Sequence, residues 1–262
     1  MRYTRGGQRR PQGAGKGLAM NGRCSLFVVA FALALVAPAG AQDDLEGRFT
    51  LAFQGGTDSE IAGNVLSDID GHLFELPVIT EARKYREVYE PSFRGQILVG
   101  FGVTGNGEII ARVSHYKMES PGGVAAGTVA GDPLFAFLDP YEEWGAELGY
   151  RFYIASRTRL KSYVAPVAGV RFLDRILLGM SAPDRGSSIS NVPHFDASTI
   201  AVFGVDMGFT FDLTPNFYVG LEAELRYQPK PTAATTAPGL AGINGEGSRW
   251  SAPIVATVGL RF

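Results

Sequence analysis

The residues best suited to catalysis are the three histidines of the chain, His72, His115 and His194. Ser114 stands directly before His115, and Glu119 follows shortly after, so this stretch holds a nucleophile, a base and an acid. A hydrolase needs these groups within hydrogen-bond reach of one another. Because neighbouring residues of a strand point to opposite faces, Ser114 and His115 cannot easily pair. The spacing therefore argues against a nucleophilic hydrolase.

A second candidate is the pair His194 and Asp196, which could form half of a protease dyad. The pair is better explained as two polar residues of a surface loop. The sequence contains no zinc spacing, calcium-loop repeat or Gly-rich phosphate loop. We therefore expect no catalytic residue, no metal and no cofactor.

Charged residues recur on the polar faces of segments that alternate like β-strands. An unpaired buried charge is costly, so arginines and carboxylates enclosed together would have to hold one another. We expect a closed plug of ion pairs, and a gated polar path for small solutes is the alternative. The expected network consists of Arg94, Arg112, Glu147, Arg151, Arg171, Asp206, Glu222, Glu224 and Arg226.

The N-terminus has the pattern of a secretory signal peptide. Residues 1–41 hold six basic residues and no acidic one, and an apolar run covers 26–37. Ala39 and Ala41 then form a small-residue cleavage site before Gln42. The apolar run is too short for a membrane-spanning helix, which needs about 20 residues. Cleavage after Ala41 is predicted.

Removal of this leader leaves residues 42–262 as one domain. It also removes Cys24, the only cysteine, and so excludes disulfides and thiol chemistry. The remaining chain has 18 basic and 26 acidic residues, a formal net charge of −8. Nucleic-acid binding requires a basic face and is not expected. We also expect translation to start at Met20, which gives a more ordinary leader.

Strand periodicity dominates the rest of the chain. In the last segment, Trp250, Val258, Leu260 and Phe262 share one apolar face, and Phe262 ends the chain. Apolar residues alternate with small or polar ones in eight segments, and this even number lets the first and last strands meet. The predicted strands are 47–56, 92–103, 108–118, 142–155, 161–173, 199–213, 216–229 and 249–262.

The connections between these strands alternate between short and long. The short ones are 104–107, 155–160 and 213–216, and the first contains an Asn-Gly hairpin turn. The long ones are 57–91, 119–141, 174–198 and 230–248, whose Gly, Pro, Ser and Asp content predicts exposed loops. Within the first of them, 59–66 and 80–88 are predicted short helices.

Short turns at one end and long loops at the other are typical of outer-membrane barrels. The sequence predicts an all-β protein, an eight-stranded antiparallel up-and-down transmembrane β-barrel with short periplasmic turns and long external loops. Trp144 and Trp250 would mark the external rim, and Phe152, Phe211, Phe217 and Phe262 the periplasmic rim. A soluble lipocalin-type barrel would have its apolar faces inside and its polar faces outside. Alternation alone does not exclude this fold.

Over 42–262 the chain resembles the small eight-stranded outer-membrane barrels of the OmpA, OmpX and OmpW kind. The resemblance rests on the ending Val-Gly-Leu-Arg-Phe at 258–262, on Pro-Asn-Phe-Tyr-Val-Gly-Leu at 215–221, and on the loop pattern. It implies the outer membrane of a Gram-negative cell as location. It also implies insertion by the general barrel-assembly machinery, for which Phe262 would be part of the recognition signal.

The expected partners are outer-membrane lipid, lipopolysaccharide and the insertion machinery, and the expected state is a monomer. Arg83, Lys84, Arg86 and Lys117 could meet lipopolysaccharide phosphates, although a solvated loop explains them better.

Three functions remain open. The first is a non-enzymatic barrel that supports envelope integrity or surface interaction through its loops. The second is an OmpW-like conduit for small or hydrophobic solutes. The third and weakest is a lipid A-modifying enzyme, because outer-membrane lipid A deacylases also use Ser, His and an acid.

Overall fold

The computed structural model describes residues 45–73, 75–156, 159–234 and 239–262. The predicted leader 1–41 and its cleavage site at Ala39, Ala41 and Gln42 lie outside the described residues. Within the described part of the chain, no helix has the length and apolar character needed to cross a membrane.

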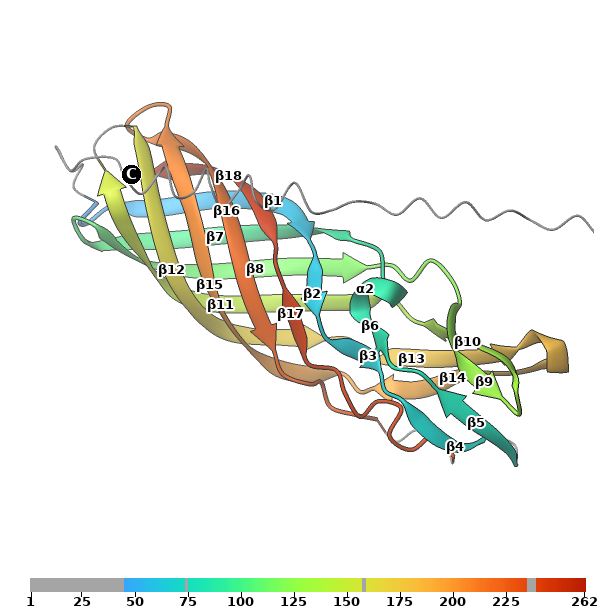
Figure 1. Cartoon of the computed structure of the whole chain (residues 1–262). Helices are drawn as coiled ribbons and strands as arrows, with labels where there is room; N and C mark the ends of the chain where they lie inside the picture. The colour runs from blue at the N-terminus through green and yellow to red at the C-terminus, as the bar shows by residue number, and fades with distance from the viewer. Residues whose placement is uncertain (1–44, 74, 157–158, 235–238) are drawn as a thin grey trace, which may run out of the picture. The chain divides into compact units, whose positions relative to one another are not determined.

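Eight antiparallel strands form a closed barrel (Figure 1). Each strand pairs with the next one along the barrel, and the last pairs with both its predecessor and the first. All eight predicted strands are therefore confirmed, with ends that shift by a few residues. They are β1 (Phe49–Asp58), β7 (Ser92–Thr104), β8 (Gly107–Met118), β11 (Tyr141–Ser156), β12 (Leu160–Leu173), β15 (Ser198–Asp212), β16 (Phe217–Gln228) and β18 (Ile254–Arg261).

The eighth predicted strand is interrupted once. Its first part, β17 (Arg249–Ser251), pairs with β16, and β18 resumes the same pairing after Ala252 and Pro253. Proline has no backbone N–H to donate to a neighbouring strand, which explains the break. On its other side β17 pairs with β2 (Glu60–Ala62), a short continuation of β1. The wall thus extends beyond the barrel at this point.

The long connections are confirmed, but three of them form hairpins in place of irregular loops. The hairpins lie side by side in a second, six-stranded sheet with the order β14-β13-β10-β9-β5-β4. Short apolar alternations inside Gly- and Ser-rich segments produce these strands, and the composition of the whole segments concealed them. The strands are β4 (Ile69–Leu73), β5 (Leu76–Thr80), β9 (Val124–Val129), β10 (Asp132–Leu138), β13 (Ile176–Ala182) and β14 (Ser187–Phe195), with a 3-10 turn η1 (Pro183–Arg185) before the last.

Of the two predicted helices, the first is wrong and the second is confirmed only over four residues. Residues 59–66 are not helical, because β2 and β3 (Asn64–Leu66) occupy them. Gly63 separates these strands with a φ of 123°, and an added Cβ would lie 2.2 Å from the carbonyl oxygen of Ser248. In 80–88 only α2 (Tyr85–Val88) is helical, after β6 (Arg83–Lys84), which pairs with β3. Strand pairing has overridden local helix preference in both segments.

The described residues of 63–91, 119–140, 174–197 and 229–248 together form what we call the cap. The fourth connection, 229–248, is hydrogen-bonded to segments at both edges of the cap sheet. The N–H of Ser67 donates to Ile243 at 2.8 Å, and the N–H of Ala234 donates to His194 at 3.2 Å. Leu240 and Ile243 are fully buried. The cap is therefore an ordered body, in contrast to four independent loops.

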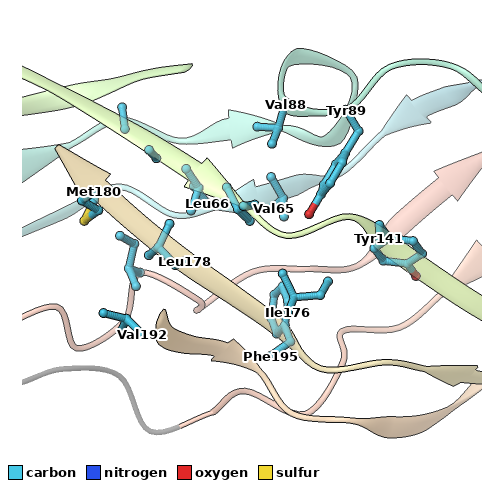
Figure 2. Packing of buried hydrophobic residues seen from close by; sticks show 14 of the residues in the cluster. Val65, Leu66, Val88, Tyr89, Tyr141, Ile176, Leu178, Met180, Val192 and Phe195 are labelled. Carbon is cyan, nitrogen blue, oxygen red and sulfur yellow. The ribbon is translucent and has the colours of Figure 1, made fainter. Parts of the chain in front are cut away.

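The cap has its own apolar core, part of which is seen in Figure 2. Tyr116, Met118, Tyr141 and Leu173, at the ends of barrel strands, belong to the same cluster, so the cap packs directly on the barrel. Its fully buried members from the cap include Val65, Leu66, Val88, Ile176, Leu178, Met180 and Phe195.

The barrel is apolar outside and polar inside. In β18, exposed and buried residues alternate without exception. Val258 and Leu260 are exposed, whereas Thr257 and Arg261 are buried. This distribution is the reverse of a lipocalin-type barrel and excludes that alternative. Each barrel strand presents large exposed apolar side chains, such as Phe53, Val99, Val113, Leu148, Phe172, Phe203, Leu225 and Val258.

Candidate functional site

The barrel lumen holds the largest collection of charged side chains. All nine residues of the predicted network are buried inside it, each with less than a twentieth of its surface exposed. They come from β7, β8, β11, β12, β15 and β16, because strand alternation directs every second side chain inward. They are Arg94, Arg112, Glu147, Arg151, Arg171, Asp206, Glu222, Glu224 and Arg226.

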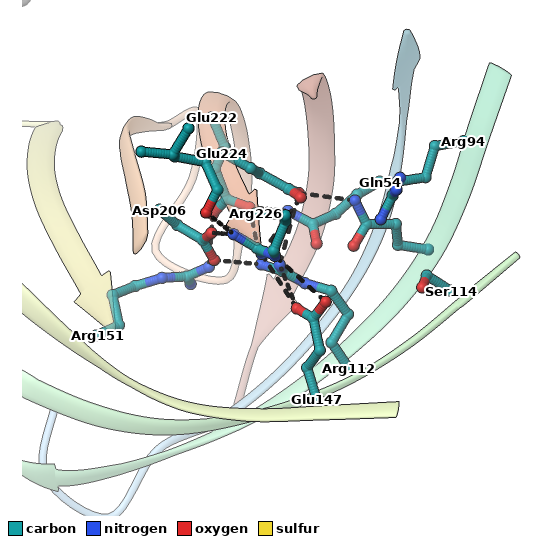
Figure 3. A network of polar contacts seen from close by, with 12 residues as sticks. Gln54, Arg94, Arg112, Ser114, Glu147, Arg151, Asp206, Glu222, Glu224 and Arg226 are labelled. Carbon is teal, nitrogen blue, oxygen red and sulfur yellow. Dashed lines mark hydrogen bonds and ion pairs between the residues drawn. The ribbon is translucent and has the colours of Figure 1, made fainter. Parts of the chain in front are cut away.

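Arg112 lies at the centre of the network (Figure 3). Its guanidinium contacts four carboxylates, those of Glu222 at 2.7 Å, Asp206 at 3.0 Å, Glu147 at 3.3 Å and Glu224 at 3.5 Å. Glu222 and Asp206 come from the opposite wall, so this one side chain ties both walls of the barrel together.

Arg226 is the second centre and shares three of these carboxylates. Its Nη2 lies 3.1 Å from Glu147 and 3.2 Å from Glu224, and its Nη1 pairs with Asp206. Glu147 in turn pairs with Arg171 of β12. Two arginines therefore share the same carboxylates, which makes each ion pair depend on the others.

A further layer lies toward the barrel end that carries the short turns. Arg151 pairs with Glu108 at 3.1 Å and with Glu222 at 3.4 Å. The hydroxyl of Tyr163 donates to Glu222 at 2.6 Å, and the Arg151 guanidinium lies 4.3 Å from the centre of the Tyr163 ring. The hydroxyl of Tyr153 donates to Glu108 at 3.1 Å. Aromatic rings and charges together fill this level.

The layer next to the cap is built around Glu143. Arg249 contacts Glu143 at 3.2 Å and Glu60 at 3.0 Å, and Arg94 contacts Glu143 at 3.6 Å. The Arg249 guanidinium also lies 4.6 Å from the centre of the Tyr141 ring. This layer joins the charged lumen to the apolar core of the cap.

Several members of the network were not predicted from the sequence. Four of them, Glu108, Glu143, Lys161 and Asp212, share the inward parity of predicted members on the same strands, as Glu143 does with Glu147. Parity alone would have found these four, whereas the other four lie on strands from which no member was predicted. The missed charged residues are Asp58, Glu60, Glu108, Glu143, Lys161, Asp212, Arg249 and Arg261.

The two candidate catalytic sets are not assembled. The Ser114 hydroxyl lies inside the barrel, where it accepts a hydrogen bond from Arg171 at 2.5 Å. His115 lies on the outer wall, 3.0 Å from Glu142, and its ring is tilted against that of Trp144 with ring centres 4.5 Å apart. Their opposite directions follow from strand alternation, as the sequence predicts.

His194 lies in the cap and does not face Asp196. Its Nε2 donates to the carbonyl oxygen of Val65 at 2.8 Å, whereas Asp196 lies 3.6 Å from Arg175. Burial lowers the pKa of His194 to about 4; the hydrogen bond to Val65 opposes this shift, and the charge of Lys230 adds to it. The ring is therefore a neutral structural contact between β14 and β3. In the described ranges, no three His, Cys, Asp or Glu side chains are grouped so as to hold a metal ion.

The predicted girdle residues lie on the outer wall. Trp144 and Trp250 are 54% and 43% exposed, at the end of the barrel that carries the cap. Phe152 and Phe262 are exposed toward the opposite end, and Phe217 is half-buried. Leu260 and Val258 continue the exposed face of the last strand. Large apolar and aromatic groups thus surround the barrel in the pattern that a bilayer requires.

The basic residues considered for lipopolysaccharide contact are partly engaged with carboxylates. Arg83 lies 2.5 Å from Glu81, and Lys117 lies 2.8 Å from Glu119. Lys84 and Arg86 are exposed on α2 and its N-terminal flank. They do not converge on one site.

No protein-family model matches the chain. No curated protein sequence matches it either. Among solved structures, the chain is similar to the outer membrane protein OprG from Pseudomonas aeruginosa, with 12% identity and a TM-score of 0.41 over 85% of this chain and 99% of OprG. It is also similar to Ail, the attachment invasion locus protein of Yersinia pestis, with 11% identity and a TM-score of 0.41 over 83% and 100% of the two chains. Neisserial surface protein A gives 15% identity and a TM-score of 0.38 over 83% and 98%.

The chain has the fold of the small eight-stranded outer-membrane barrels. Its own strand pairing establishes this, because β18 closes on β1 and no other strand intervenes. The predicted resemblance to barrels of the OmpA, OmpX and OmpW kind is thereby confirmed at the level of the architecture.

Proposed function

We propose that the chain is an integral outer-membrane protein whose barrel crosses the lipid with a closed lumen. The exposed apolar wall around all eight strands carries this proposal. Hydrocarbon offers no hydrogen-bond partner, so a strand protein can cross it only as a closed barrel with its polar groups inside. The inverted faces of this barrel meet both conditions.

The short turns fix the proposed orientation. The turns at Thr104–Gly107 and Leu213–Asn216 lie at the end opposite the cap. Outer-membrane barrels place short turns in the periplasm and long segments outside. The cap then lies outside the cell, and Phe262 lies at the periplasmic rim, where the insertion machinery would read it. Because one chain closes the barrel, a monomer suffices.

The lumen favours a structural role over transport. Side chains fill the narrow interior of an eight-stranded barrel, and here they are charged and paired from end to end. Opening a water path would separate several ion pairs at once. We infer that the barrel is a non-enzymatic anchor and that the cap supports envelope integrity or surface interaction.

Two measurements test this function. The chain should be recovered in the outer-membrane fraction and should migrate differently on a gel before and after heating. The purified protein should give no discrete conductance steps in planar bilayers. Recovery as a soluble periplasmic protein would overturn the membrane assignment. Reproducible steps would instead support the conduit for small solutes.

A further inference from the structure

The outer face of the cap sheet carries an apolar patch with no covering element among the described residues, and Asp70, His72 and Thr128 lie beside it on the same face. On β10, Leu134, Ala136 and Leu138 point into the cap core, so Phe135 and Phe137 point outward. We call this surface the apolar cap face. It consists of Pro77, Ile79, Ala125, Phe135, Phe137 and Leu177.

Strand pairing makes these residues neighbours. Phe135 pairs with Ala125 of β9, and Ile79 of β5 pairs with Thr128 of the same strand. The ring of Phe137 lies over Gly123, where an added Cβ would meet it at 2.7 Å. Ile79 is 55% exposed and Phe137 is 44% exposed. An apolar surface that spans several strands of an external domain marks an interaction site.

Lipid does not explain this surface, because a charged row separates it from the barrel wall. Asp139 and Asp174 are exposed between the girdle residue Trp144 and the apolar cap face. Glu142 lies in the same row and is half-buried against His115. Charged residues are destabilising on a lipid-facing wall except near the interface. The membrane boundary therefore lies at this row, and the apolar cap face lies beyond it.

The charge of the cap identifies the kind of partner. Its residues include 13 acidic and 6 basic ones, a formal net charge of −7. The other residues of 45–262 include 11 acidic and 12 basic ones, a formal net charge of +1. A surface of one sign attracts partners of the opposite sign and repels its own kind. A second cap and an anionic lipid surface are both disfavoured.

We propose that the apolar cap face docks a basic protein partner that presents apolar side chains. The apolar face would supply the buried contact, and the acidic cap would attract the partner and surround the contact with complementary charge. This goes beyond the proposed function, which leaves the partner open, and it rests on that function only for the external position of the cap.

The test is a binding titration with the full chain folded in an uncharged detergent. The probe is a fluorescent peptide built from lysine and phenylalanine, and the matched control peptide has glutamate in place of lysine. Empty micelles give the background. We expect saturable binding of the lysine peptide that weakens with salt, and no binding of the glutamate peptide.

The variant Ile79→Ser/Phe137→Ser should weaken binding of the lysine peptide about tenfold or more, as loss of central apolar contacts does. Ile61→Ser is the matched control, because Ile61 is 48% exposed but lies on β2, outside the apolar cap face. Its affinity should stay unchanged, and heat-modifiable migration checks that each variant is folded.

Equal affinity of wild type and the double variant would overturn the proposal, and so would equal binding of both peptides. Self-association that Ile79→Ser/Phe137→Ser abolishes would overturn it in favour of a second copy. Because the titration requires no bilayer, its failure is distinct from a failure of membrane insertion.

Discussion

Arg226 of β16 and Glu147 of β11 form a two-armed ion pair across the lumen, although β12 and β15 separate them along the wall. The Nε of Arg226 donates to Glu147 Oε1 at 3.2 Å, and its Nη2 donates to Oε2 at 3.1 Å. Two parallel hydrogen bonds fix the distance and the orientation of both side chains. The pair therefore holds the register of strands that do not touch.

Glu147→Gln should destabilise the folded barrel by about 3 kcal/mol or more, because it leaves buried arginines without a shared anion. Arg112, Arg171 and Arg226 all contact this carboxylate. Urea unfolding in lipid vesicles measures the change. The control is Glu142→Gln, which removes an outward carboxylate paired with His115 and should cost about 1 kcal/mol or less. Equal effects of the two variants would show that the lumen network does not stabilise the barrel.

The cap should become less stable as pH falls from about 6.5 to about 4. Burial lowers the pKa of His194 from its ordinary value of 6.5 to about 4 in the folded state. Between these values the unfolded state binds the proton more readily, so acid favours opening; above 6.5 the full stability is present. The loss amounts to about 3 kcal/mol. This loss of stability is measured by hydrogen exchange of the Ala234 N–H, which donates to the backbone carbonyl oxygen of His194.

His194→Gln is the control for this pH dependence, because the amide can still donate to Val65 but does not titrate. His72 and His115 remain in both proteins, which differ only at position 194. The exchange rate at Ala234 should then vary less between pH 4 and pH 6.5. An unchanged profile would assign the acid sensitivity to another group.

Phe262→Ser should reduce barrel assembly in cells while leaving the assembled barrel nearly as stable. The backbone of Phe262, which the change retains, exchanges hydrogen bonds with Phe49 at 2.8 and 3.0 Å. Its side chain is 66% exposed, and its ring stacks on Phe49 with ring centres 6.4 Å apart. The heat-modifiable fraction in outer membranes measures assembly. Phe211→Ser, at the same end on β15, is the control, and an equal loss in both would argue against a terminal recognition signal.

Alternation predicted the barrel well because each wall strand separates an exposed apolar face from a charged interior. This contrast between faces makes the period of two easy to see, as in 217–227, where apolar residues oppose Glu222, Glu224 and Arg226. The same alternation places Glu143 and Glu108 inward near the ends of their strands, although neither was predicted as a member of the network.

The cap could not be predicted in the same way. Its strands are short, and its outward residues include Phe137 and Ile79, so both faces of the sheet are apolar and the alternation is weak. Its stability depends on contacts between distant connections, such as that of Ser67 with Ile243. Local composition does not reveal pairings between distant segments. The Gly- and Ser-rich segments were therefore predicted as loops.

The two tryptophans of the chain test the central claim, that the apolar outer wall faces lipid, without any substitution. Trp144 and Trp250 are the only ones in the sequence, and both are exposed on the outer wall at the cap end of the barrel. Fluorescence of the native chain in vesicles of brominated phospholipid measures their contact with acyl chains. Strong quenching by bromines near the headgroups, with weak quenching by an aqueous quencher, is the predicted result. Strong aqueous quenching without any effect of the brominated lipid would contradict a membrane-spanning barrel.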